Sequence, residues 1–129
     1  MSVKRTFYND DPTRLKAEWF EIDGKKNGPY KSYHYPNGQL DEEVNYINGE
    51  RNGIYRSYHE NGQLNVEVNY IDGEKNGIYR TYHENGQLEF EINYINGLEN
   101  GIERSYYDDG QLCTEVNYIN GKENGIGRS

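Results

Sequence analysis

The sequence repeats itself every 24 residues, and this period limits what the chain can fold into. Residues 53–76 and residues 77–100 agree at 17 of 24 positions. Similar units begin at Gly28 and Gly101. A period of this length is typical of a repeat array, in which each unit buries its apolar side chains against its neighbours.

Within the unit, two runs of alternating residues flank Asn61-Gly62. Asn-Gly between such runs is a strong hairpin signal, because both residues tolerate the positive φ of a type I′ turn. A two-residue loop would pair Glu60 with Gln63, His59 with Leu64, Ser57 with Val66, Arg56 with Glu67, Tyr55 with Val68 and Gly53 with Tyr70. Arg opposite Glu and an aromatic opposite a β-branched residue are favoured cross-strand pairs, which supports this register.

Residues 72–75 join this hairpin to the next, and we expect a four-residue loop there. Such a loop would place Tyr70 opposite Gly77, Val68 opposite Tyr79 and Glu67 opposite Arg80. The predicted fold is therefore all-β, an elongated, solenoid-like single antiparallel sheet of stacked β-hairpins. One charged row would cross every strand: Lys31, Glu43, Arg56, Glu67, Arg80, Glu91, Arg104, Glu115 and Arg128.

The repeat pattern also divides the chain. Residues 1–27 are interpreted as a degenerate N-terminal capping repeat, with Trp19 at the position of Val44 as a plug for the open end. Residues 28–125 hold four hairpin repeats, starting at 28, 53, 77 and 101. The first carries one extra residue at Tyr35-Pro36, and residues 126–129 are predicted to start a further strand. Two alternatives follow for this open edge: the natural chain continues past Ser129, or the edge strand is a template for edge-to-edge self-association.

Composition and charge narrow the function. A mean hydropathy of −1.18, 33% apolar residues and a net charge of −8 favour disorder, but 14 tyrosines and a strict period argue against it. The acidic balance disfavours nucleic acid and anionic lipid and suits a basic protein partner. The single Cys113 allows no intramolecular disulfide. The sequence contains no membrane-spanning run and no secretory signal, so a cytoplasmic location is expected.

Two columns of titratable side chains could suggest chemistry. Equivalent positions lie two strands apart, about 10 Å, so His34, His59 and His83 cannot share one zinc ion with its ~2.0 Å bonds. The column of Glu43, Glu67, Glu91 and Glu115 is spaced more widely than the ~5–9.5 Å of paired glycosidase carboxylates. Basic residues on both sides would keep these carboxylates ionised, which is the wrong state for a general acid. We therefore predict no catalytic residue, no metal site, no cofactor and no enzymatic activity.

A second set of residues favours binding. Four tyrosines recur at one position and are predicted to lie on the face opposite Leu64, Val66 and Val68, together with the Arg–Glu row and two isoleucines. Tyrosine and arginine are enriched at interface hot spots. The candidate partner-binding residues are Tyr33, Tyr58, Tyr82, Tyr106, Arg56, Arg80, Ile54 and Ile78. The alternative is that these tyrosines only cover the second side of a single-layer sheet.

The unit resembles a known family in three segments, residues 61–64 (Asn-Gly-Gln-Leu), residues 69–73 (Asn-Tyr-Ile-Asp-Gly) and residues 76–77 (Asn-Gly). They resemble the MORN (membrane occupation and recognition nexus) repeat, and more closely the bacterial variant form found in YwqK-type antitoxin proteins. The resemblance extends from about residue 15 to residue 125. One departure is that Ile54 and Ile78 follow the glycine where other members often carry Glu or Lys.

The resemblance implies an elongated run of β-hairpins that acts as a non-enzymatic scaffold for protein–protein interaction. An antitoxin or immunity-like protein that binds a basic partner is one such role. Two alternatives remain open. One is a membrane- or phospholipid-associating module, which the net charge disfavours. The other is a regulatory repeat segment of a larger lipid-kinase-like enzyme, although the sequence lacks the lysine and metal-binding carboxylates that phosphoryl transfer needs.

Overall fold

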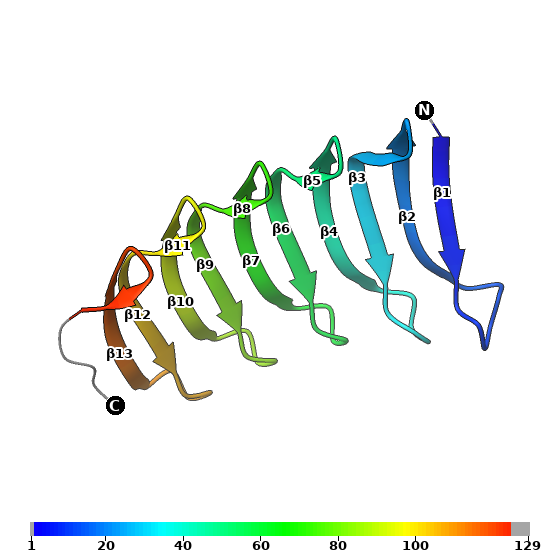
Figure 1. Ribbon diagram of the computed structural model, residues 1–129. Coiled ribbons are helices and arrows are strands. Elements are labelled where there is room, and N and C mark those ends of the chain that lie inside the picture. Colours follow the sequence, from blue (N-terminus) through cyan, green and yellow to red (C-terminus); the bar gives the residue numbers. More distant parts are fainter. Residues whose placement is uncertain (1, 125–129) are drawn as a thin grey trace.

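The computed structural model describes residues 2–124, and every regular element in that part of the chain is a β-strand. The strands form one open antiparallel sheet in which hairpin follows hairpin along the array (Figure 1). The hairpin strands, in spatial order, are β1 (Ser2–Phe7), β2 (Leu15–Ile22), β3 (Lys25–Tyr33), β4 (Leu40–Ile47), β6 (Gly53–Tyr58), β7 (Leu64–Ile71), β9 (Gly77–Tyr82), β10 (Leu88–Ile95), β12 (Gly101–Tyr106) and β13 (Leu112–Ile119). The predicted fold class is confirmed.

Short strands complete the turns at one end of the hairpins. All four pair with the long strand before them: β5 (Glu50–Arg51), β8 (Glu74–Lys75), β11 (Leu98–Glu99) and β14 (Lys122–Glu123). Figure 1 shows β5, β8 and β11 side by side along one edge of the array. The predicted strand over residues 126–129 lies outside the described residues.

The predicted register holds through the middle of each hairpin. Tyr55 lies opposite Val68, Arg56 opposite Glu67, and Gly53 opposite Tyr70. Between hairpins, Glu67 lies opposite Arg80. The charged row therefore crosses the sheet as expected, because these pairings depend on the alternation of the strands and not on the turns.

The turn around Asn61-Gly62 differs from the prediction. Its loop has three residues: the N–H of His59 donates to the Gln63 carbonyl at 2.8 Å, and the N–H of Gly62 donates to the His59 carbonyl at 2.9 Å. Only Gly62 has a positive φ, of 90°, as in a type I turn followed by a glycine bulge. The Asn61 side chain accepts the N–H of Gln63 at 2.9 Å, a contact that satisfies the turn without a left-handed Asn.

This loop shifts the register at the end of the hairpin. Tyr58 lies opposite Leu64 across a bulge, so the predicted pairing of His59 with Leu64 is wrong. The first full repeat has a loop one residue longer, from Tyr35 to Gly38, between His34 and Gln39, whose backbones are hydrogen-bonded. The extra residue was predicted there, although both loops exceed the expected length by one.

The second turn also differs from the expected four-residue loop. Asp72 and Gly73 have φ of 50° and 84°, and Ile71 lies opposite Glu74. This is a two-residue hairpin with the positive φ values of a type I′ turn. Tyr70 therefore lies opposite Lys75, and not opposite Gly77 as predicted. The chain recovers the register through Gly77, whose φ is 99°.

The two faces of the sheet differ in packing. The buried apolar residues Ala17, Val44, Val68 and Ile92 are 1–5% exposed, and each lies in register with aromatic or small residues of the neighbouring strands. We call this side the aromatic face. Its paired rings are Trp19, Tyr30, Tyr46, Tyr55, Tyr70, Tyr79, Phe90 and Tyr94.

Cationic side chains from the turns lie over the rings of the aromatic face. The Arg51 guanidinium is 4.8 Å from the centre of the Tyr55 ring and 5.3 Å from that of Tyr70. The Lys75 ammonium is 4.7 Å from the centre of the Tyr79 ring. These cation–π contacts, together with edge-on ring pairs, stabilise a core that is only one side chain deep.

The N-terminal hairpin of β1 and β2 replaces the standard turn with residues 8–14. Trp19 lies opposite Tyr30, the same partner that Val44 has on the other side, so the predicted equivalence of the two positions is seen in the register. The Trp19 indole donates to Glu21 at 2.8 Å. The role of residues 1–27 as a cap stays a prediction.

Candidate partner-binding face

The face opposite the aromatic face carries the charged row, and we call it the ion-row face. Arg56 lies 2.8 Å from Glu67, Arg80 lies 3.2 Å from Glu91, and Arg104 lies 2.9 Å from Glu115. These ion pairs fall within hairpins. Among the described residues, one ion pair of the row joins two hairpins: Arg56 lies 3.9 Å from Glu43. Each glutamate of the row thus lies in register between two basic residues, as predicted. The ion-pair distances are short within hairpins and longer between them.

The row is electrically balanced. The hydrogen bond that Arg56 donates to Glu67 raises the pKa of Arg56, and the one that Arg104 donates to Glu115 raises the pKa of Arg104. β1 and β2 extend the row with Arg5 and Glu18, which are 2.7 Å apart. Five basic and five acidic side chains therefore alternate in register across the described sheet: Arg5, Glu18, Lys31, Glu43, Arg56, Glu67, Arg80, Glu91, Arg104 and Glu115.

Tyr58 is attached directly to this row. Its hydroxyl donates to Glu43 at 3.0 Å. Burial raises the pKa of Tyr58, and the Glu43 carboxylate raises it further, so the phenol stays protonated and donating. The other predicted tyrosines, Tyr33, Tyr82 and Tyr106, are also half-buried and end their strands at the equivalent bulge.

The two predicted isoleucines lie on the ion-row face and are open to solvent. Ile54 is 48% exposed and Ile78 is 47% exposed. A second isoleucine column, which the sequence analysis missed, begins with Ile47 and Ile71, exposed at 50% and 47%. Period-two alternation from Glu67 through residue 69 places Ile71 on the same face, so this column could have been found from the sequence.

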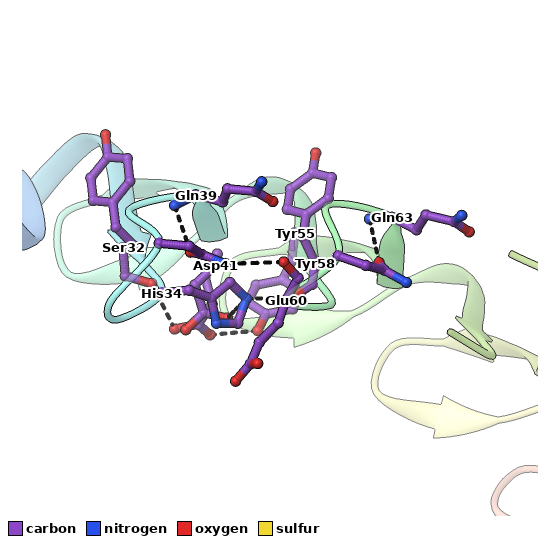
Figure 2. A network of polar contacts seen from close by, with 12 residues as sticks. Ser32, His34, Gln39, Asp41, Tyr55, Tyr58, Glu60 and Gln63 are labelled. Atoms are coloured by element: carbon purple, nitrogen blue, oxygen red, sulfur yellow. Dashed lines mark hydrogen bonds and ion pairs between the residues drawn. The ribbon is translucent and has the colours of Figure 1, made fainter. Parts of the chain in front are cut away.

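The histidine column has a structural role that was not predicted. The Nε2 atom of His59 lies 2.7 Å from the Tyr82 carbonyl of the next repeat, and His34 and His83 make the equivalent contacts at 2.7 and 2.8 Å. In the same turns, Asn61 donates its side-chain amide to the Glu84 carbonyl at 2.8 Å. Figure 2 shows the first of these inter-repeat contacts, with His34 reaching towards Tyr58. These side chains fasten one hairpin to the next.

On the aromatic side, the half-buried Glu42 accepts hydrogen bonds from Ser32, at 3.3 Å, and from Tyr55, at 2.5 Å. Burial raises the pKa of Tyr55, and Glu42 adds to the increase. These polar groups satisfy each other's hydrogen bonds and so support the fold.

The last described repeat breaks the pattern of the aromatic face. Glu103 stands where earlier repeats have Tyr55 and Tyr79, and Glu99 stands where they have Arg51 and Lys75. Burial raises the pKa of Glu103, and the neighbouring Glu99 carboxyl raises it further. Acidic groups thus replace an aromatic ring and its cation.

Glu103→Gln is expected to stabilise the protein at neutral pH. A folded-state pKa above the unfolded value means that the native state binds the proton more tightly, so this site loses stability as pH rises through the interval between the two pKa values. The free energy of unfolding of the variant should exceed that of the wild type by about 0.2–1 kcal/mol at pH 7. The difference should vanish below about pH 4. Urea unfolding at both pH values measures it. Glu60→Gln, in an exposed turn, is the control, and equal effects of the two substitutions would contradict the prediction.

Among residues 2–124, no three histidine, cysteine or acidic side chains are grouped so that they could hold a metal ion. In the same part of the chain, no helix has the length and apolarity needed to cross a membrane.

An open sheet of tandem hairpins, with balanced charges on one face and packed rings on the other, defines a β-hairpin repeat scaffold. The MORN repeat variant matches residues 26–48, 51–72, 75–96 and 99–120, more than half of the chain. The chain therefore belongs to the MORN repeat variant family. Members of this class act as repeat scaffolds that typically bind protein or membrane, and they are generally non-catalytic.

A solved structure described as "Crystal Structure of TarM" is similar over 81% of this chain at 16% identity, with a TM-score of 0.45. The chain spans 20% of the length of that structure. No curated protein matches the sequence.

Proposed function

We propose that the protein is a cytoplasmic, non-enzymatic scaffold that binds a basic protein partner through the ion-row face, as an antitoxin or immunity-like protein does. The observation that carries this proposal is the composition of that face. Half-exposed arginines, tyrosines and isoleucines recur there in the three hairpins that begin with β6, β9 and β12. Tyrosine and arginine are the residue types that most often contribute binding energy at interfaces.

Charge supports a basic partner. The row itself is balanced, so the net charge of −8 resides on the rest of the chain. A partner is thus attracted by the acidic surroundings and meets neutralised ion pairs at the contact surface. Long-range attraction of this kind raises association rates and is screened by salt. The same acidity disfavours anionic membranes, and strong flotation with anionic vesicles would favour the membrane alternative.

Tyr58→Ala/Tyr82→Ala is expected to weaken partner binding about tenfold or more, because both side chains lie on the proposed surface. Capture of partners from the source cell, followed by titration with the purified partner, measures the loss. Tyr35→Ala/Tyr107→Ala is the matched control, since these tyrosines are 42% and 55% exposed at turns away from the row. Undiminished binding by the first variant, with its circular dichroism unchanged, would remove the ion-row face from the proposal.

A further inference from the structure

The exposed isoleucines of the ion-row face form two parallel rows, one near the start of β6, β9 and β12 and the other at the end of β4, β7, β10 and β13, and we call the two rows together the isoleucine stripe. Each long strand from β4 to β13 contributes one, and all are exposed at 44–50%. Apolar side chains scattered singly on a surface are ordinary, whereas a contiguous apolar patch marks an interaction site. The isoleucine stripe consists of Ile47, Ile54, Ile71, Ile78, Ile95, Ile102 and Ile119.

Shallow hollows lie beside three of these isoleucines, Ile54, Ile78 and Ile102. One has a volume of about 200 Å³ and is lined by residues that include Pro29, Asn45 and Ile54. Another, also about 200 Å³, lies between Ile78 and Ile102. Both hollows reach the charged row, at Arg56 and at Arg80 respectively. A partner can therefore insert apolar side chains at positions set by the repeat.

The spacing of these positions fits an α-helix. Strands lie about 4.7–4.9 Å apart, so equivalent points recur about every 9.5 Å along the array. Seven residues of an α-helix advance about 10.5 Å. A helix that lies along the array therefore presents about one heptad per hairpin, with a difference of about 1 Å per heptad. Its two apolar heptad positions then fall beside the two isoleucines of each hairpin.

The charged row selects the flanks of such a helix. A residue that recurs every seven positions meets the same member of the Arg–Glu alternation at each hairpin. Lysines at that position would face Glu67, Glu91 and Glu115 in turn, whereas glutamates would face Arg56, Arg80 and Arg104. The acidity of the rest of the chain favours the lysines.

We propose that the isoleucine stripe is the docking site for a basic amphipathic helix of about three heptads, presented by the partner. This inference rests on the proposed function, because it names the element by which a basic partner would bind the same face. The helix lies along the array, seats apolar side chains between the isoleucines, and places lysines beside the glutamates of the row.

A synthetic helix tests the proposal on the full chain. The probe is a labelled peptide of about 21 residues with Leu at the two apolar heptad positions and Lys at the flanking position. Fluorescence anisotropy should show saturable binding, and circular dichroism should show added helix. A peptide of the same composition, reordered to break the seven-residue spacing, should bind at least about tenfold more weakly, as should a peptide with Glu in place of the flanking Lys.

Matched variants locate the site. Ile54→Thr/Ile78→Thr keeps β-branched side chains in both strands and should weaken peptide binding about tenfold. Phe7→Thr/Leu112→Thr is the control. It removes two apolar side chains of similar exposure, 45% and 46%, at the end of the hairpins that lies away from the isoleucines. This variant should bind the peptide as the wild type does.

Each remaining outcome decides against the helix. Equal binding of the reordered peptide, or unchanged binding by Ile54→Thr/Ile78→Thr, would overturn it. A wild-type dimer in sedimentation velocity that this variant dissociates would assign the stripe to a second copy of the chain. A natural partner that depends on Tyr58 and Tyr82 but does not compete with the peptide would overturn the helix and leave the proposed function standing, whereas a partner independent of both surfaces would overturn both.

Discussion

Ile92→Ala is expected to destabilise the protein by about 2–5 kcal/mol, the range for removing a fully buried aliphatic side chain. Ile92 is 1% exposed and lies opposite Tyr79 on the aromatic face. In a sheet with a single packed layer, few other side chains can move to fill the cavity. Urea unfolding followed by circular dichroism measures the loss, provided that the transition is tested for two-state behaviour, because long arrays can lose cooperativity.

The chain offers a matched control for this substitution. Ile102→Ala changes the same residue type in the neighbouring hairpin, but Ile102 is 44% exposed on the ion-row face. Its cost should stay below about 1 kcal/mol, the span of strand propensities. Similar losses for both variants would mean that the two faces contribute equally to the core, which contradicts the assignment of the packed side to the aromatic face.

The sheet was predictable because several sequence signals point to the same structure. Alternation, the 24-residue period and the opposition of Arg56 to Glu67 all specify one register, and a shift of one residue would expose Val68 and bury the row. Such agreement between local and global signals is what makes a repeat sequence informative. The pairing of Glu67 with Arg80 followed even though the turn between these strands was wrongly predicted.

The turns were mispredicted because two Asn/Asp-Gly pairs have similar sequences but different structures. Asp72-Gly73 forms the tight turn with two positive φ values, whereas Asn61 keeps an ordinary φ and uses its side chain to accept the N–H of Gln63. The same three-residue loop forms at residues 108–110, where Asp109 accepts the N–H of Gln111 at 2.9 Å and Gly110 has a φ of 90°. An Asn/Asp-Gly pair therefore fits both turn types, and the pair alone does not specify the length of the loop.

The candidate site was predicted only in part, because strand alternation gives the face of a side chain and not the shape of the surface around it. Strand alternation places Ile54, Arg56 and Tyr58 on one face, and they lie there in the structure. Alternation does not give the depth of the surface, so the hollows beside Ile54 and Ile78 could not be predicted from the sequence. That a partner binds these residues stays a prediction, and the binding experiments test it.

Gly77→Ala is expected to cost about 1–3 kcal/mol, the range for a residue held in a sparsely populated backbone region. Gly77 has a φ of 99°, and a Cβ added there would meet no atom within 4 Å. The cost would therefore come from the backbone alone, at the bulge that returns β9 to the register of Arg80. Ile78→Ala, the next residue and 47% exposed, is the control and should cost less than about 1 kcal/mol. Urea unfolding compares the two variants, and a Gly77→Ala protein as stable as the wild type would show that the strand can reach its register without the left-handed bulge.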